Sequence, residues 1–302
     1  MTRSTNALAA LAGVALLAFA GAAAAEPTPP RLFDHSQLIT GDRISVEVIG
    51  KGPDLVFIPG LASSREVWRA TSERLRTHYR LHLIQVAGFA GEGPRANATG
   101  PVLTPTAEAI DAYIVSAKLT PATVIGHSMG GTIALWLAEH HPEHLKKVML
   151  VDAVPFVSQV FISPDVTLDV ATKVAEHIRT APPQPDADQA KMIDAMVSGD
   201  KDRAMVVAWG HASDAGVVKN ALADDFELDM RPGLAAITTP ITLLYPDYAP
   251  LGVPAGATDK RYGGFFATAP NMKLERVDHS LHFIMLDQPA AFAADLDAFL
   301  AG

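Results

Sequence analysis

A serine flanked by glycines is the strongest chemical signal in this sequence. Gly126-His127-Ser128-Met129-Gly130 has the pattern G-x-S-x-G, and Gly131 extends it. A short apolar run precedes the motif and a helical pattern follows it, and this strand-turn-helix context exposes such a serine at a sheet edge. The motif therefore predicts that Ser128 is a nucleophile and that the Met129 N–H stabilises an oxyanion.

A serine hydroxyl is a weak nucleophile and needs a base that a third group orients. His279 and His282 follow the last predicted strand, and we predict that His282 is the base. Asp247 directly follows the predicted strand Ile241–Tyr245 and gives the chain order Ser, Asp, His, so we predict that it is the acid. Asp152, which ends an earlier predicted strand, is the alternative acid.

A second oxyanion donor is expected from the loop after an earlier strand. The apolar run Asp54–Ile58 ends in Pro59-Gly60, which predicts a buried strand followed by a glycine turn. The N–H of Leu61 is the donor that this turn offers. The alternative is an ordinary strand-to-helix turn with no role in the chemistry.

Strand and helix patterns alternate along most of the chain. Apolar or alternating runs predict strands at Ile44–Ile49, Asp54–Ile58, Leu81–Val86, Thr123–Gly126, Val148–Asp152, Ile241–Tyr245 and Met272–Val277. Helical patterns between or after them cover residues 64–77, 106–118, 131–140 and 289–300. Strands separated by helices indicate an α/β domain with a mainly parallel sheet, which binds ligands at the carboxyl edge of its strands.

The alternation stops between residues 155 and 232. This segment has helical patterns near 166–179, 188–197, 201–211 and 217–226 and no convincing strand pattern. We predict a helical cap at 155–232, inserted into a core domain of residues 26–154 and 233–302. The apolar run Val154–Ile162 either lines an acyl pocket or belongs to the core of the cap. The acidic residues of the cap (Asp224, Asp225, Glu227 and Asp229) either attract an amino terminus or form a solvated face.

These motifs resemble the α/β-hydrolase superfamily, over essentially all of residues 32–302. The resemblance rests on three segments: Pro59-Gly60-Leu61, the G-H-S-M-G-G elbow at 126–131, and His282-Phe-Ile-Met-Leu-Asp-Gln-Pro289. It implies an eight-stranded, mostly parallel sheet with helices on both faces, an inserted helical cap, and hydrolysis through an acyl-enzyme.

Two positions depart from the pattern of that superfamily. Gln85 stands where members usually have an aspartate before the turn that follows the fourth strand. Tyr245-Pro246-Asp247 replaces the usual Gly-x-x-Asp after the acid-bearing strand. The second departure bears on the choice between Asp247 and Asp152, and neither affects the nucleophile.

The first 25 residues have the features of a signal peptide. Arg3 precedes an uncharged stretch, Ala7–Ala25, which ends in small residues suited to cleavage. We therefore predict export and a periplasmic or secreted mature chain, with an uncleaved membrane anchor as the alternative. No later stretch is apolar for long enough to suggest another span.

Composition excludes several classes of protein. Hydrophobic residues make up 49% of the 302 residues and charged residues 19%, which excludes a disordered chain. A net charge of −9 argues against nucleic-acid binding, and the absence of cysteine excludes disulfides and thiolate metal sites. His140, His141 and His144 cluster at a helix end, where histidines meet the terminal carbonyls, so we expect no metal site. No cofactor motif is present.

The sequence thus predicts a serine hydrolase that cleaves a carboxylic ester, or an amide, of a small-molecule substrate. The triad would be Ser128, His282 and Asp247, with an acyl-enzyme intermediate. Two alternatives remain open: an exported aminopeptidase-like hydrolase, and a catalytically silent binding protein on the same fold. The sequence says nothing of oligomeric state.

Overall fold

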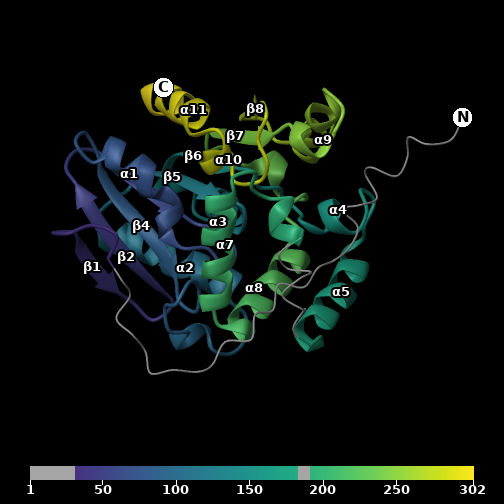
Figure 1. Ribbon diagram of the computed structural model, residues 1–302, viewed down its shortest axis with the longest axis horizontal. Helices are drawn as coiled ribbons and strands as arrows, with labels where there is room; N and C mark the ends of the chain where they lie inside the picture. Colours follow the sequence, from purple (N-terminus) through teal and green to yellow (C-terminus); the bar gives the residue numbers. More distant parts are fainter. Residues whose placement is uncertain (1–30, 183–190) are drawn as a thin grey trace, which may run out of the picture.

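An eight-stranded sheet lies at the centre of the computed structural model, which describes residues 31–182 and 191–302 (Figure 1). The strand order is β1-β2-β4-β3-β5-β6-β7-β8; β2 is antiparallel to β1 and β4, and the pairs from β4 to β8 are parallel. The strands are β1 Gln37–Thr40, β2 Ile44–Gly50, β3 Asp54–Ile58, β4 Arg80–Val86, β5 Ala122–His127, β6 Leu145–Val151, β7 Ile241–Pro246 and β8 Met272–Val277. The predicted fold class is confirmed.

Helices cover both faces of the sheet because its central strands are apolar on both sides. Val124 and Ile125 in β5 are fully buried and point to opposite faces. Val124 belongs to a core that includes Ile110 of α2, whereas Ile125 shares a core with Phe292 of α11. The helices of the domain are α1 Arg69–Leu75, α2 Leu103–Ser116, α3 Met129–His140, α9 Ala257–Phe265, α10 Ile284–Asp287 and α11 Pro289–Ala301.

The described residues between β6 and β7 form helices and loops without a strand. These helices are α4 Ser158–Phe161, α5 Leu168–Thr180, α7 Asp200–Ala212 and α8 Ala215–Glu227. Helix α5 packs on α8 through Ile178 and Phe226, and in Figure 1 α5 lies on the side of the molecule opposite β1. The helix predicted at 188–197 lies partly outside the described residues. The signal peptide predicted at 1–25 lies wholly outside them.

Three elements of the domain, β1, α9 and the four-residue α10, have no counterpart in the sequence prediction. Strand β1 is only four residues long and half-exposed, so its alternation is too short to detect. Helix α9 contains Gly263 and Gly264 and has little apolar periodicity. In residues 31–182 and 191–302, no helix combines the length and the apolar character needed to cross a membrane.

Candidate active site

Ser128 occupies a strained turn between β5 and α3. Its φ of 54° and ψ of −126° lie in a region that residues other than glycine rarely adopt. The Ser128 N–H donates to the Val151 carbonyl at 3.0 Å, which ties the turn to β6. A Cβ atom on Gly126 would lie 2.2 Å from the Gly130 carbonyl oxygen, so the close approach of strand and helix requires glycine there. The predicted elbow is therefore present, and Ser128 lines a cavity.

His282 lies in the loop between β8 and α10 and contacts an aspartate. Its Nδ1 is 2.6 Å from Oδ2 of Asp152, and the two side chains are 15% and 4% exposed. A carboxylate only accepts hydrogen bonds, so we assign the ring proton to Nδ1. The other ring nitrogen, Nε2, is then an acceptor, and both His282 and Ser128 line the same cavity.

Two tyrosines also donate to Asp152. The Tyr248 hydroxyl lies 2.9 Å from Oδ2, and the Tyr262 hydroxyl bonds Oδ1. Burial, followed by the Asp152 charge, raises the pKa of both phenols well above its ordinary value, so both stay protonated. With His282, Asp152 accepts from three donors, which together fix the position of its carboxylate.

The prediction that Asp247 orients the histidine is wrong. The Asp247 carboxylate instead accepts from the Ala249 N–H at 3.0 Å, in the turn that follows β7. Asp152 follows β6, which is adjacent to the nucleophile strand β5, and His282 reaches this strand end instead of the end of β7. A φ of 46° at Asp152 turns the chain as it leaves β6. His279 is exposed and is not part of the cavity wall.

Two backbone N–H groups beside Ser128 are free to bind an oxyanion. Leu61 and Met129 both line the cavity. Among the described residues neither N–H has a hydrogen-bond acceptor. Met129 is the first residue of α3, whose N-terminal dipole favours negative charge. Their placement fits the pair of donors predicted from sequence.

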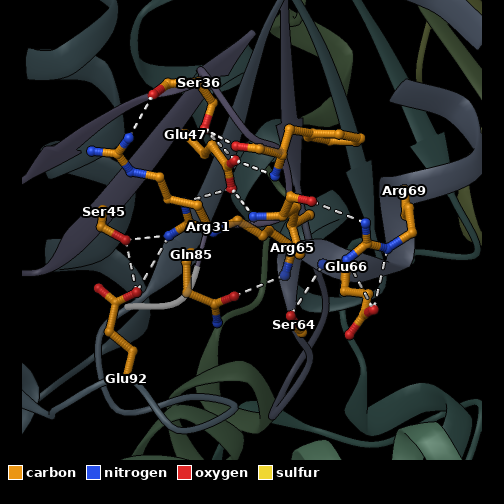
Figure 2. Close-up of polar contacts among 12 residues, drawn as sticks. Arg31, Ser36, Ser45, Glu47, Ser64, Arg65, Glu66, Arg69, Gln85 and Glu92 are labelled. Carbon is orange, nitrogen blue, oxygen red and sulfur yellow. Dashed lines mark hydrogen bonds and ion pairs between the residues drawn. The ribbon is translucent and has the colours of Figure 1, made fainter. Parts of the chain in front are cut away.

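Gln85 anchors the loop that carries Leu61. Its Oε1 accepts from the Arg65 N–H at 2.7 Å (Figure 2). Its Nε2 donates to the Ser63 carbonyl at 3.0 Å. The buried Arg65 guanidinium lies 3.3 Å from the Glu92 carboxylate, and burial lowers its pKa. Gln85 thus connects this loop to β4, a role that only its departure from the superfamily pattern hinted at.

His127 fixes the backbone of the histidine loop. Its Nε2–H donates to the His282 carbonyl at 3.0 Å, and the two ring centroids are 4.6 Å apart. Complete burial, followed by the neighbouring His282, lowers the pKa of His127 well below its ordinary value. His127 therefore stays neutral and places no positive charge beside the ring of His282.

The cavity at the serine has a volume of about 180 Å³ and a largely apolar wall. Much of the wall comes from the segment between β6 and β7, through Val154, Val157, Val160, Phe161, Leu222 and Phe226. The run Val154–Ile162 thus divides between the two predicted roles, because Phe156 is completely buried in a separate core cluster. The site is suited to an apolar acyl group.

The acidic residues at the end of α8 do not form an acidic pocket. Asp224 accepts from the Val102 N–H at 2.6 Å and from Arg179, which also pairs with Glu227. Asp229 pairs with the neighbouring Arg231. Of the four acids in the run, Asp225 is the one that lines the cavity.

Asp225 makes stability depend on pH. Burial raises its pKa to about 7, with the Asp224 charge adding to this and a hydrogen bond from Thr132 opposing it. In the unfolded chain this carboxyl has a pKa of about 3.9. Between these two pKa values the folded chain therefore binds one proton more than the unfolded chain does. The free energy of unfolding then falls as the pH rises towards 7.

We therefore compare the free energies of unfolding of Asp225→Asn and the wild type at two pH values. We expect the difference, variant minus wild type, to be about 2 kcal/mol larger at pH 8 than at pH 5. Urea unfolding at both pH values measures this difference. Asp42→Asn, at an exposed position, is the control, and its difference in stability from the wild type should be the same at both pH values. A variant whose advantage is equal at the two pH values would contradict a raised pKa.

One group of side chains outside the cavity has the composition of a metal site. Asp111, His141 and His144 each place one ligand atom within 4.8 Å of the others. His144 Nδ1 already lies 2.8 Å from Asp111 Oδ1. The two histidines follow the C-terminal end of α3, whereas Ser128 precedes its first residue, so this group takes no part in the serine site.

A family model described as "alpha/beta hydrolase fold" matches residues 53–202. Solved structures agree: a hydrolase from Pseudomonas aeruginosa PA01 has a TM-score of 0.70 at 17% identity, covering 89% of this chain and 99% of that one. An esterase (EaEST) from Exiguobacterium antarcticum has a TM-score of 0.68 at 23% identity, covering 88% and 98%. At these identities the structures establish the fold alone.

Curated relatives include proteins named pimeloyl-[acyl-carrier protein] methyl ester esterase. The one from Aeromonas salmonicida is 37% identical over 112 residues, which are 37% of this chain and 42% of that relative. The one from Nitrosomonas europaea is 26% identical over 269 residues, 84% of this chain and 98% of that relative. The match with the higher identity, to the relative from Aeromonas salmonicida, thus spans less than half of that relative's length.

Proposed function

Because the chain belongs to the α/β-hydrolase superfamily, we propose that it is a serine hydrolase of carboxylic esters. The observation that carries this proposal is the pairing of His282 with Asp152 in the cavity that Ser128 lines. The strained conformation of Ser128 supports it further, because strain of this kind persists where it serves a function. We propose that Ser128, His282 and Asp152 form the catalytic triad.

The chemistry follows from the assigned proton positions. His282 Nε2 accepts the Ser128 hydroxyl proton while the serine oxygen attacks the ester carbonyl. The Leu61 and Met129 N–H groups stabilise the oxyanion of the tetrahedral intermediate. His282 then returns its proton to the leaving alcohol, and an acyl-enzyme on Ser128 remains. Water, deprotonated by His282, attacks this ester and releases the acid and the free serine.

Asp152 acts without taking up the proton. Its carboxylate holds the His282 ring with Nδ1 protonated and stabilises the imidazolium that forms during attack. The hydroxyls of Tyr248 and Tyr262 hold the carboxylate in place. These two tyrosines are therefore positioning residues for the acid.

The wall of the cavity favours an ester over a peptide. An aminopeptidase needs a charged pocket for the amino terminus of its substrate, and three of the four acids in the predicted acidic run are engaged in ion pairs. The remaining lining is largely apolar. The names of the curated relatives, which are methyl ester esterases, point to esters of small alcohols.

A substrate panel tests this proposal. We expect hydrolysis of methyl and p-nitrophenyl esters of short and medium-length acids, and at least about 100-fold lower kcat/KM for aminoacyl anilides, a difference of about 2.8 kcal/mol in transition-state binding. Turnover of the anilides at the rate of the esters would favour the aminopeptidase alternative. A lack of turnover on all of them, with the folded protein in hand, would favour the silent binding protein.

A further inference from the structure

Two histidines that follow α3 contact an aspartate of α2. Nδ1 of His144 lies 2.8 Å from Oδ1 of Asp111, and Nδ1 of His141 lies 3.9 Å from Oδ2 of the same carboxylate. Asp111 is 8% exposed. The third histidine of the cluster behaves as the sequence predicts, because Nδ1 of His140 lies 3.0 Å from the Trp136 carbonyl oxygen. The cluster therefore divides into one histidine at the helix end and two at Asp111.

Both nitrogens of each of these two rings lie near a carboxylate. Nε2 of His141 is 3.4 Å from Glu108, which precedes Asp111 by one turn of α2, and Nε2 of His144 is 3.8 Å from Glu143. A neutral imidazole has one N–H, so its other nitrogen presents a lone pair to a carboxylate, which is unfavourable. Either a second proton on each ring or one metal ion shared by both rings removes this conflict.

A shared metal ion removes the conflict without a second one. The two rings are nearly parallel, with 8° between their planes and centroids 5.7 Å apart, so two protonated rings would place like charges side by side. An ion bound to both Nδ1 atoms leaves each Nε2–H directed at a glutamate, which is the usual arrangement for histidine ligands of a metal. His141 also caps the C-terminal end of α3, where the helix dipole favours positive charge.

The separations between the ligand atoms suit zinc. Zn²⁺ binds histidine nitrogen and carboxylate oxygen at about 2.0–2.2 Å, so two ligand atoms of a tetrahedral site lie about 3.4 Å apart. The separations of 2.8 and 3.9 Å at Asp111 lie on either side of this value. The turn that carries the histidines is ordered before binding by Pro142 and by the hydrogen bond from the His144 N–H to the His141 carbonyl at 3.0 Å. Mg²⁺ and Ca²⁺ prefer oxygen ligands, so the two imidazoles disfavour them.

We propose that Asp111, His141 and His144 bind a zinc ion, with the fourth position of the tetrahedron left to water. Glu108 and Glu143 orient the two rings. Helix α3 has 12 residues and is about 18 Å long, and it separates this site from the nucleophile. The ion thus joins α2 to the turn after α3, and the proposal does not depend on the proposed function.

Isothermal titration calorimetry tests the site on purified protein that has no histidine tag and has been freed of metal with EDTA. At about pH 7.5 we expect one Zn²⁺ per chain with a Kd of about 10 µM or lower, and no binding of Mg²⁺. Zinc at about 100 times its Kd should raise Tm by about 5 °C. His141→Ala and Asp111→Asn should weaken Zn²⁺ binding by about 100-fold or more, and Glu108→Gln by about tenfold.

His140→Ala is the matched control, because His140 is the adjacent histidine and its ring is stacked on Trp136. It should keep the wild-type affinity. Asp111→Asn and Glu108→Gln preserve the shape of the side chain, so they decide the matter if His141→Ala does not fold. A wild-type Kd above about 10 µM would overturn the proposal. So would a tight site that survives Asp111→Asn, or an equal loss of affinity in His140→Ala, since binding would then lie elsewhere or on histidines in general.

Discussion

Replacing Ser128 with alanine lowers kcat on the best ester of the panel by about 10⁴-fold or more. The substitution removes the nucleophile and leaves in place the His282–Asp152 pair and the free N–H groups of Leu61 and Met129. The residual rate then comes from binding and oxyanion stabilisation alone. Steady-state kinetics on purified protein measure the loss, and thermal unfolding shows that the fold is retained.

Ser116→Ala is the control for this loss. Ser116 is an exposed residue at the end of α2, and its hydroxyl bonds the Tyr113 carbonyl of the same helix. Its substitution leaves kcat unchanged. If Ser128→Ala keeps more than about one-tenth of the wild-type kcat, another group is the nucleophile and the triad proposed here is wrong.

Asp152→Asn and Asp247→Asn have very different effects. An asparagine at 152 presents an uncharged amide to His282 Nδ1. The amide no longer stabilises the imidazolium and favours the wrong tautomer of His282, so we expect kcat to fall by about 10⁴-fold. Within residues 31–182 and 191–302, Asp247 accepts only from the Ala249 N–H in its turn, so Asp247→Asn should change kcat less than about threefold.

Kinetics on both variants beside the wild type check this contrast. KM should change little in Asp152→Asn, because the lost interaction strengthens during the reaction and not on substrate binding. The reverse pattern, with Asp247→Asn inactive and Asp152→Asn nearly normal, would mean that the histidine loop rearranges in the working enzyme.

The predicted site residues that the structure brings together around the cavity are those with a local signal. Ser128 and Met129 follow from a motif whose neighbouring glycines are required by the 2.2 Å approach at Gly126. Leu61 follows from the glycine turn after β3, and His282 from its position between the last strand and the last helix. In each case a few consecutive residues determine both the backbone turn and the direction of the functional group.

The acid could not be chosen in the same way because the choice depends on how the histidine loop packs against the loops that follow β6 and β7. Asp152 and Asp247 each follow a strand, and the sequence does not say which strand end faces the histidine loop. The roles of Tyr248, Tyr262 and Asp225 depend on how α8, α9 and the loop after β7 pack around the cavity. A single sequence carries no direct signal for such packing.

Two further sequence predictions stay predictions. Export rests on Arg3 and the stretch Ala7–Ala25, which precede the described residues. The helical cap at 155–232 is consistent with the helices found there, and its boundaries and independence from the core domain await a test. Neither bears on the chemistry of Ser128.

Reaction of the wild-type protein with a fluorophosphonate, followed by mass spectrometry of its peptides, tests the central claim most directly. Such probes phosphonylate a serine that an adjacent base activates. The structure predicts one phosphonyl group per chain, on Ser128, and no labelling of the Ser128→Ala variant. An unmodified Ser128 in a folded protein that still hydrolyses esters, or a label on a different residue, would contradict the account.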